Sequence, residues 1–270
     1  MGQREGAERR ITRAAVLKQG EKTRPPGESA GTYLDRATHV SLCGKGLTSM
    51  EHLDKIGPSI RVLYLFDNRI TSICALRSTC ITHLHLQDNC IETIDNLHAL
   101  SSLVQLHLAR NRIRRIAGLE NLRSLQVLDV SDQRGDLPVE LDPRSMQALA
   151  EGLVHLNISN NRMVSLQDVS CLASLETLRA SNNAFADVHE ACQVVGQLRS
   201  LREIDLQGAP FGLSPSKYRS AVIDAASSSL ELLDGKAVRD EERCFVKRVM
   251  PSRRQVPVQK RTSAGWLVPI

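Results

Sequence analysis

A repeated pattern of leucines and isoleucines constrains this sequence more than any other feature. In residues 60–73, Leu63 and Leu65 alternate as in a β-strand, whereas the isoleucines after Asn68 recur every third residue as in a tight helical turn. This stretch therefore predicts one short strand, a sharp bend and a compact return.

The same skeleton recurs along most of the chain at intervals of about 22 residues. The predicted units begin at Ala37, Ile60, Ile81, Leu103, Leu125, Leu153, Leu175 and Leu201. A strand of three or four residues cannot bury its apolar side alone, so stacked copies are needed to share a core. We therefore predict an α/β solenoid, a horseshoe with a parallel sheet on its concave side and short helices or 3-10 turns on its convex side.

An asparagine position lies at the bend of most units. It is filled by Asn68, Asn89, Asn111, Asn161 and Asn183, whereas Lys45, Gln133 and the region of Gly208 replace it elsewhere. A buried asparagine amide has two donors and an acceptor, enough to satisfy backbone groups of its own turn and the adjacent one. We therefore interpret the template leucines, isoleucines and asparagines as structural.

Three segments follow from this pattern. Residues 1–36 are charged and poor in large apolar side chains, so we predict a disordered lead. Residues 37–238 are predicted to form a solenoid of about eight units with a C-terminal cap. Within it, Asp142 can cap a short helix in the long fifth unit, and residues 190–198 also have a helical pattern. Residues 239–270 are predicted to be a basic tail.

The net charge of +5 is unevenly distributed. Residues 37–235 carry −4, residues 1–36 carry +3 and residues 236–270 carry +6. An acidic body between basic ends is not typical of a nucleic-acid-binding domain, so we expect no direct nucleic-acid contact. The ends are interpreted as solvated tails. The alternative is that they are segments that dock specifically on an anionic partner.

Cysteine usage and motif content restrict the functional class. The seven cysteines are odd in number and lack paired spacing, which favours a reducing compartment. The sequence has neither a long apolar run nor a secretory leader pattern, so we expect no membrane span and no secretion. The motifs of serine hydrolases, zinc proteases and phosphate-binding loops are absent. We therefore expect no catalytic residues, no enzyme activity and no cofactor.

The predicted partner-binding surface is the concave face, where residues flanking the core leucines of each strand point outward. Its residues are Val62, Tyr64, Phe66, His83, His85, Gln87, Gln105, His107, Arg110, Asp129, Asp132, His155, Asn157, Arg179, Glu203 and Asp205. Tyr64 and Phe66 are the favoured anchors, because aromatic side chains are scarce here and are enriched at interfaces. The alternative is that neighbouring side chains or the N-terminal segment cover them.

Three histidines fall on this predicted surface. His83 and His85 share a strand face, and His107 takes the place of His85 on the next strand. Such a trio could bind zinc, with water completing the coordination. Because no cysteine or carboxylate reinforces the trio, we favour polar contacts with a partner and predict no metal.

Several stretches resemble the SDS22-like subclass of leucine-rich repeats over about residues 37–240. They are the template LxxLxLxxNxIxxIxxL, the segments VLYLFDN and THLHLQDNCI, the divergent unit with LDPRSMQALAEGLVHLNISNN, and the closing YRSAVIDAASSSLELLDGKAV. The closing segment is similar to the subclass's C-terminal cap, in which a Tyr-Arg pair, here Tyr218 and Arg219, precedes a Leu-Asp-Gly sequence.

This resemblance implies a non-enzymatic scaffold, a regulatory or targeting subunit that binds the catalytic subunit of protein phosphatase 1. It also implies a cytoplasmic protein, a monomer within complexes, at the centrosome, microtubules and the cytoskeleton of the cilium or flagellum. One alternative is a structural axonemal or centrosomal adaptor that binds tubulin or dynein without the phosphatase. A second is a ribonucleoprotein scaffold, because similar caps occur in a spliceosomal leucine-rich subunit.

Overall fold

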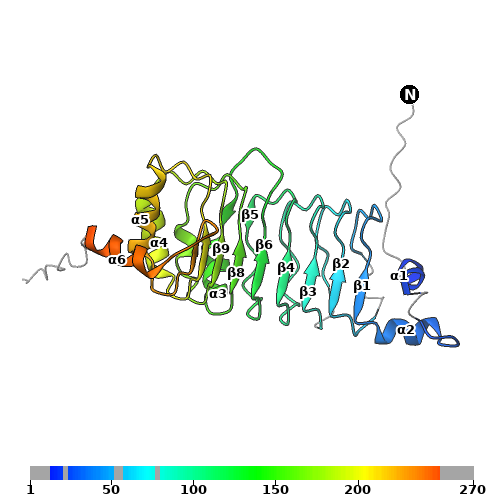
Figure 1. Ribbon diagram of the computed structural model, residues 1–270. Coiled ribbons are helices and arrows are strands. Elements are labelled where there is room, and N and C mark those ends of the chain that lie inside the picture. Colours follow the sequence, from blue (N-terminus) through cyan, green and yellow to red (C-terminus); the bar gives the residue numbers. More distant parts are fainter. Residues whose placement is uncertain (1–12, 21–23, 52–56, 77–79, 250–270) are drawn as a thin grey trace, which may run out of the picture.

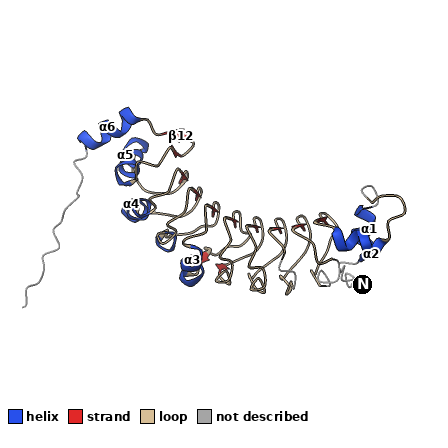
Figure 2. Ribbon diagram, turned by 90° about the horizontal axis from the view of Figure 1, so that it is seen from below, coloured by secondary structure: helices blue, strands red, loops and turns tan. Residues whose placement is uncertain are grey.

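The computed structural model describes residues 13–20, 24–51, 57–76 and 80–249. These residues form a curved stack of similar turns, most of which contribute one short strand to a continuous sheet (Figure 1). The strands line the inner side of the curve, and the helices lie at the two ends and on the outer side (Figure 2). The predicted α/β solenoid with a parallel concave sheet is confirmed.

Among the described residues, the main sheet has ten strands in the order β1-β2-β3-β4-β6-β8-β9-β10-β11-β12. Eight of them are parallel and three residues long: β1 (His39–Ser41), β2 (Val62–Tyr64), β3 (His83–His85), β4 (Gln105–His107), β6 (Val127–Asp129), β8 (His155–Asn157), β9 (Thr177–Arg179) and β10 (Glu203–Asp205). Then β11 (Leu232–Leu233) pairs with β10 in parallel, and β12 (Lys236–Ala237) pairs with β11 in antiparallel fashion. Each of the eight begins two residues after a predicted unit start, so the repeat spacing located all of them.

A column of aliphatic side chains runs through the middle of these strands. The register places Leu63 between Val40 and Leu84. The column continues through Leu106, Leu128, Leu156, Leu178 and Ile204. Each fully buried leucine stabilises the fold by roughly 1.5–3 kcal/mol. Because each strand shares this core with both neighbours, no unit is stable on its own.

A ladder of buried side-chain amides joins each turn to the one before it, and we call it the amide ladder. The Oδ1 atom of Asn89 accepts a hydrogen bond from the Ile70 N–H at 3.0 Å. Its Nδ2 donates to the carbonyls of Leu65 and Leu86, also at 3.0 Å. The same pattern recurs at Asn68, Asn111 and Asn183. The predicted bonding of an asparagine to its own and the adjacent turn is confirmed at these four positions, and Asn161 donates to the Val130 carbonyl of the adjacent turn at 2.9 Å.

Gln133 takes the asparagine position in the fifth unit with a longer side chain. Its Oε1 accepts from the Ile113 N–H at 2.9 Å, and its Nε2 donates to the Leu108 and Val130 carbonyls at 2.9 and 3.1 Å. Its own N–H donates to the Oδ1 of Asn161 at 2.9 Å. The amide ladder therefore continues through a unit whose sequence departs from the template.

The extra residues of the fifth unit lie away from the concave sheet. They form the second sheet and a helix: β5 (Arg115–Ile116), β7 (Glu140–Leu141) and α3 (Pro143–Leu149). The Asp142 carboxylate caps α3 by accepting from the Ser145 N–H at 3.1 Å. The predicted capped helix is therefore confirmed, and Figure 2 places α3 on the convex side.

Two further elements continue the convex side, η2 (Gln167–Val169) and α4 (Val188–Gln197). The second of these confirms the helix predicted near residues 190–198. In the part of the chain that the structure describes, no helix is both long and apolar enough to cross a membrane.

Two helices close the C-terminal end, α5 (Pro215–Ala225) and α6 (Asp240–Val249). The Tyr218 hydroxyl lies 3.4 Å from Oδ1 of Asp234, and Arg219 donates to the Leu233 carbonyl at 3.1 Å. Arg219 also forms an ion pair of 2.6 Å with Glu242, which fixes α6 to α5. The basic tail predicted for residues 239–270 therefore starts with a packed helix, and residues 250–270 lie outside the described residues.

The predicted disordered lead also needs correction within the described residues. The helices α1 (Arg13–Gly20) and α2 (Ala30–Arg36) cover the N-terminal end of the core, with Val16 and Leu34 buried. The contact with α2 is close, since a Cβ atom at Gly57 would lie 2.2 Å from the Leu34 carbonyl oxygen. Leu17 and Tyr33 also pack against this core. These few apolar side chains gave too weak a pattern for the sequence to predict the two helices.

We predict that Gln133→Ala lowers the free energy of unfolding by about 1–3 kcal/mol, because it leaves the buried Ile113 N–H unpaired. The Leu108 and Val130 carbonyls keep their bonds from Asn111 and Asn161. Urea unfolding at neutral pH measures the change. The control is Gln126→Ala, since Gln126 is exposed on the same unit and its loss should change stability by less than about 0.5 kcal/mol. Equal stability of the two variants would contradict the role of the ladder.

Candidate partner-binding surface

The concave surface consists of the first and third residues of the three-residue strands, whose side chains point away from the core. In β3, β4, β6 and β10 the middle residue is buried and both flanking residues are partly exposed. Most of the residues predicted for partner binding occupy these positions: Val62, Tyr64, His83, His85, Gln105, His107, Asp129, His155, Asn157, Arg179, Glu203 and Asp205.

The remaining predicted residues lie beyond the strand ends: Phe66, Gln87, Arg110 and Asp132. Arg110 and Asp132 occupy turns with φ of 56° and 58°. The left-handed backbone there ends the two-residue alternation on which the prediction depended. Val62 is on the concave surface but only 8% exposed, since the register places it between His39 and His83.

Three rings stack across neighbouring strands of the concave surface, and we call them the ring stack. The centroids of Tyr64 and His85 are 4.7 Å apart with planes inclined by 20°, and those of His85 and His107 are 4.6 Å apart with planes inclined by 6°. The register places these residues side by side on β2, β3 and β4. The rings therefore repeat with the spacing of the strands, about 4.8 Å.

His85, the central ring of the stack, is uncharged at neutral pH. Burial, followed by the neighbouring His107 and His83, lowers the pKa of His85 from 6.5 to about 4. Protonating His85 would place a cation in a half-buried position beside other imidazoles. The stack therefore offers a flat, weakly polar surface that suits apolar or planar groups of a partner.

Two of the three histidines considered for zinc, His85 and His107, stack face to face. Among the described residues, no group of three or more His, Cys, Asp or Glu side chains is placed to hold a metal ion. The planes of His85 and His107 differ by only 6°. Since the lone pair of an imidazole nitrogen lies in its ring plane, face-to-face rings cannot direct their nitrogens at one common ion.

An acidic hollow follows the ring stack toward the C-terminal end. It has a volume of about 340 Å³ and is lined by residues of β4 to β10, including Asp129, Arg179 and Glu203. Asp129 accepts a hydrogen bond from the Ser131 hydroxyl at 2.8 Å and lies 3.9 Å from the His107 ring nitrogen. Burial opposes its charge, but these contacts outweigh burial and hold the pKa of Asp129 below its usual value. The hollow therefore contains a partly buried carboxylate that can bind a basic side chain.

A salt-bridge cluster fixes the rim where the strands turn. Asp88 forms ion pairs with Arg110 at 2.6 Å and Arg134 at 2.8 Å. The hydrogen bond from Arg110 is the main reason why the pKa of Asp88 is lowered. Arg110 is thus paired within the chain. The sequence pattern did not predict this pair, although Asp88 and Arg110 each precede a ladder asparagine and so occupy equivalent positions.

The described ends of the chain leave the concave surface open. In Figure 2, α1 and α2 lie at the N-terminal end and α6 lies at the opposite end, and within the described residues neither crosses the strands. Phe66 is 42% exposed and Tyr64 is partly exposed. Both predicted anchors are therefore accessible, Tyr64 as a member of the ring stack and Phe66 outside it.

Comparisons with known proteins agree with this architecture. Residues 81–121 match the family described as Leucine Rich repeats (2 copies). Among solved structures, internalin C2 from Listeria monocytogenes is similar with a TM-score of 0.63 and 25% identity, and the likeness covers 81% of this chain and 91% of that one. Repeat sequence and fold therefore agree with each other.

Two curated relatives share part of the sequence. The geranylgeranyl transferase type-2 subunit alpha of Homo sapiens is 32% identical over 152 residues, which is 56% of this chain and 25% of the relative. That of Pongo abelii is 32% identical over 155 residues, or 57% of this chain and 26% of the relative. The chain thus spans about a quarter of the length of these relatives.

We predict that the protein loses stability as the pH falls from 7 to 5, and that His85→Gln reduces this loss. The pKa of His85 is about 4 in the folded chain against an ordinary 6.5. Over this range the unfolded chain binds the extra proton, so the free energy of unfolding falls with pH. Chemical denaturation at both pH values measures the loss.

The control is His155→Gln, since His155 is an exposed histidine of the same sheet. This substitution should leave the loss between pH 7 and pH 5 the same as in the unsubstituted protein. A loss that is unchanged in His85→Gln would rule out the ring stack as its source.

Proposed function

We propose that this leucine-rich repeat protein is a non-enzymatic scaffold that binds the catalytic subunit of protein phosphatase 1 on its concave surface. The observation that supports binding there is the open concave surface itself, on which the ring stack adjoins an acidic hollow. Aromatic side chains beside a charged site can provide both an apolar anchor and an electrostatic contact.

The choice of partner depends on the sequence resemblance. Within the SDS22-like subclass, we propose a relationship to protein phosphatase 1 regulatory subunit 42, the testis leucine-rich repeat protein, which the chain resembles. The similarity includes the divergent Gln133 unit as well as the regular repeats. We extend the proposal to a cytoplasmic protein that places the phosphatase at the centrosome, the microtubules or the cytoskeleton of the cilium or flagellum.

Short docking motifs do not offer a better route to the phosphatase. Such peptides need a basic residue, then Val or Ile, any residue, and then Phe or Trp. Arg61, Val62 and Tyr64 approach this pattern, but they belong to or adjoin β2, and Val62 is buried in the sheet. A docking peptide must be free to bind the phosphatase in extended form. These residues are not free, because β2 is paired with a strand on each side. We therefore assign the contact to the folded concave surface.

Two other scaffold functions remain as alternatives. An axonemal or centrosomal adaptor would bind tubulin or dynein through the same surface without the phosphatase. A ribonucleoprotein scaffold is disfavoured by the net charge of −4 on residues 37–235, since direct RNA binding requires excess positive charge. Affinity capture with mass spectrometry separates these functions by recovering phosphatase, axonemal proteins or a ribonucleoprotein.

We predict that the double variant Tyr64→Ala with Phe66→Ala weakens binding of purified phosphatase 1 catalytic subunit at least tenfold, about 1.4 kcal/mol, because two anchors are lost. Calorimetric titration of the full chain measures the affinity. The far-ultraviolet spectrum should be unchanged, because neither side chain belongs to the buried core.

The matched control is Leu137→Ala with Val164→Ala, since both residues are exposed large hydrophobics outside the concave surface. This control should bind like the unsubstituted chain. If the anchor variant binds the phosphatase as tightly as the unsubstituted chain does, this surface is excluded. If the unsubstituted chain does not bind the phosphatase, the phosphatase is excluded as the partner.

A further inference from the structure

The convex side has an apolar groove at its C-terminal end, which we call the C-terminal groove. It has a volume of about 570 Å³ and lies between α4, α5 and α6. Apolar atoms dominate its walls, which include Val188, Cys192, Leu213, Ala221, Phe245 and Val249. None of these residues lies on the concave surface, so the groove is separate from the proposed phosphatase contact.

Large hydrophobic side chains are exposed in this groove to an unusual degree. Leu213 is 42% exposed, Phe245 is 63% exposed and Val249 is 61% exposed. They are three of the seven exposed large hydrophobic side chains among the described residues. An apolar cluster of this kind on a soluble surface normally marks a binding site.

The helix α6 builds one wall of the groove and is held firmly in place. Phe245 and Val249 are four residues apart, so they lie on the same face of the helix. Val246 beside them is 2% exposed and belongs to the core. The ion pair of 2.6 Å between Arg219 and Glu242 ties α6 to α5. The apolar wall is therefore a fixed feature of the fold.

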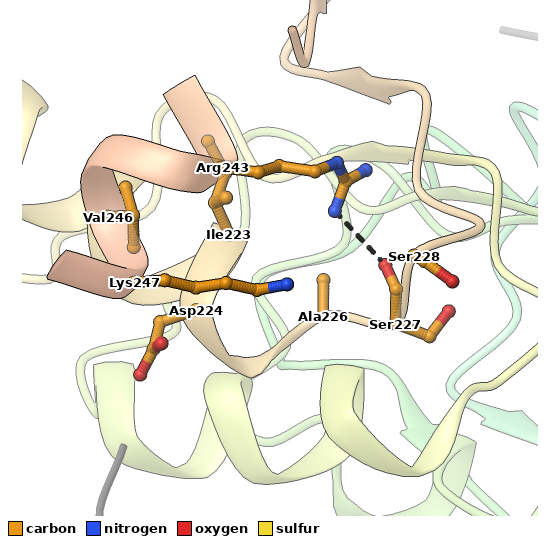
Figure 3. Close-up of a pocket in the computed structure, with 8 residues that line it drawn as sticks. All are labelled: Ile223, Asp224, Ala226, Ser227, Ser228, Arg243, Val246 and Lys247. Carbon is orange, nitrogen blue, oxygen red and sulfur yellow. Dashed lines mark hydrogen bonds between the residues drawn. The ribbon is translucent and has the colours of Figure 1, made fainter. Parts of the chain in front are cut away.

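The other side of α6 has a different chemistry. Figure 3 shows a second cavity, lined by Arg243 and Lys247 of α6 together with Asp224 and serines after α5. There the Arg243 guanidinium donates to the Ser227 carbonyl at 3.3 Å, so this cation is already bonded within the fold. Of the two cavities beside α6, the C-terminal groove is therefore the apolar one.

A segment of this chain has the composition that the groove requires. Residues 250–270 follow Val249, which itself lines the groove. Their sequence contains a basic stretch and then Trp266, Leu267 and Val268. Sixteen residues separate Val249 from Trp266. A random coil of sixteen residues has an end-to-end distance of about 20–24 Å. The helix α6 is about 15 Å long, so Trp266 can reach back along the groove.

Charges of both signs lie near the groove, so its apolar lining and the reach of the segment carry the choice of occupant. Cys192 lines the groove, and burial together with the carboxylates of Asp224 and Asp187 raises the pKa of its thiol to about 11. Lys217 contributes to the lining of the groove, whereas Asp224 lines the second cavity. Residues 250–265 contain four basic residues and no acidic one.

We propose that Trp266, Leu267 and Val268 dock into the C-terminal groove of the same chain. The docked segment covers the exposed side chains of α6 and holds the basic residues 253–261 against the convex side. The concave surface stays open, so this contact neither requires nor prevents binding of the phosphatase.

The single tryptophan of the chain provides the test, because Trp266 reports on its own surroundings. In the full chain we expect its fluorescence to lie at shorter wavelength than that of N-acetyltryptophanamide, with at least twofold weaker acrylamide quenching. Leu213→Asp and, separately, Val249→Ser should shift the emission and the quenching toward those of the free amide. Both residues lie outside the buried core, and a far-ultraviolet spectrum checks the fold of each variant.

The matched control is Leu137→Asp, since Leu137 is 57% exposed and lies between β6 and β7, away from the groove. It should leave the tryptophan spectrum unchanged. Free-amide fluorescence in the unsubstituted chain would overturn the proposal, as would unchanged spectra in both groove variants. A shielded signal that disappears on dilution would also overturn it, because it would assign the groove to a second copy of the chain.

Discussion

The amide side chain that each turn sends into the preceding one is the interaction on which this fold depends. Strands of three residues provide few backbone hydrogen bonds, and the bends between them would leave buried carbonyls and N–H groups unpaired. The amide ladder pairs these groups at Asn68, Asn89, Asn111 and Asn183 and uses Gln133 where asparagine is missing. Successive turns are thereby fixed at one spacing, and that spacing brings the rings of Tyr64, His85 and His107 into contact.

Much of this architecture could be predicted from the sequence because the same physical requirement recurs in every unit. Each apolar start preceded a strand by two residues, and the buried amides bonded as expected. The helix that Asp142 caps was also predictable, since its signal is local. Where a feature occurred once, as with α2 and Leu34, no repetition was present to support a prediction.

The concave surface could be predicted only in part, for a different reason. The two-residue alternation of side chains correctly predicts which strand residues lie on the concave surface. It fails where the backbone turns left-handed, as at Arg110 and Asp132. Side-chain partners across units depend on register, so neither the ring stack nor the pairing of Asp88 followed from the strand pattern alone. Val62 shows the same limit, because the histidines on neighbouring strands cover it.

The uneven build of the convex side has a mechanical consequence. The chain returns without a helix after β3 and β4, whereas from α3 onward it returns partly through helices. A helix is about 10 Å across and strands lie about 4.8 Å apart, so helical returns force neighbouring units to splay on the outside. Figure 2 accordingly shows a nearly straight row of strands that bends toward the C-terminal end. The rings therefore lie on the flatter part of the solenoid, and the curvature is concentrated toward its C-terminal end.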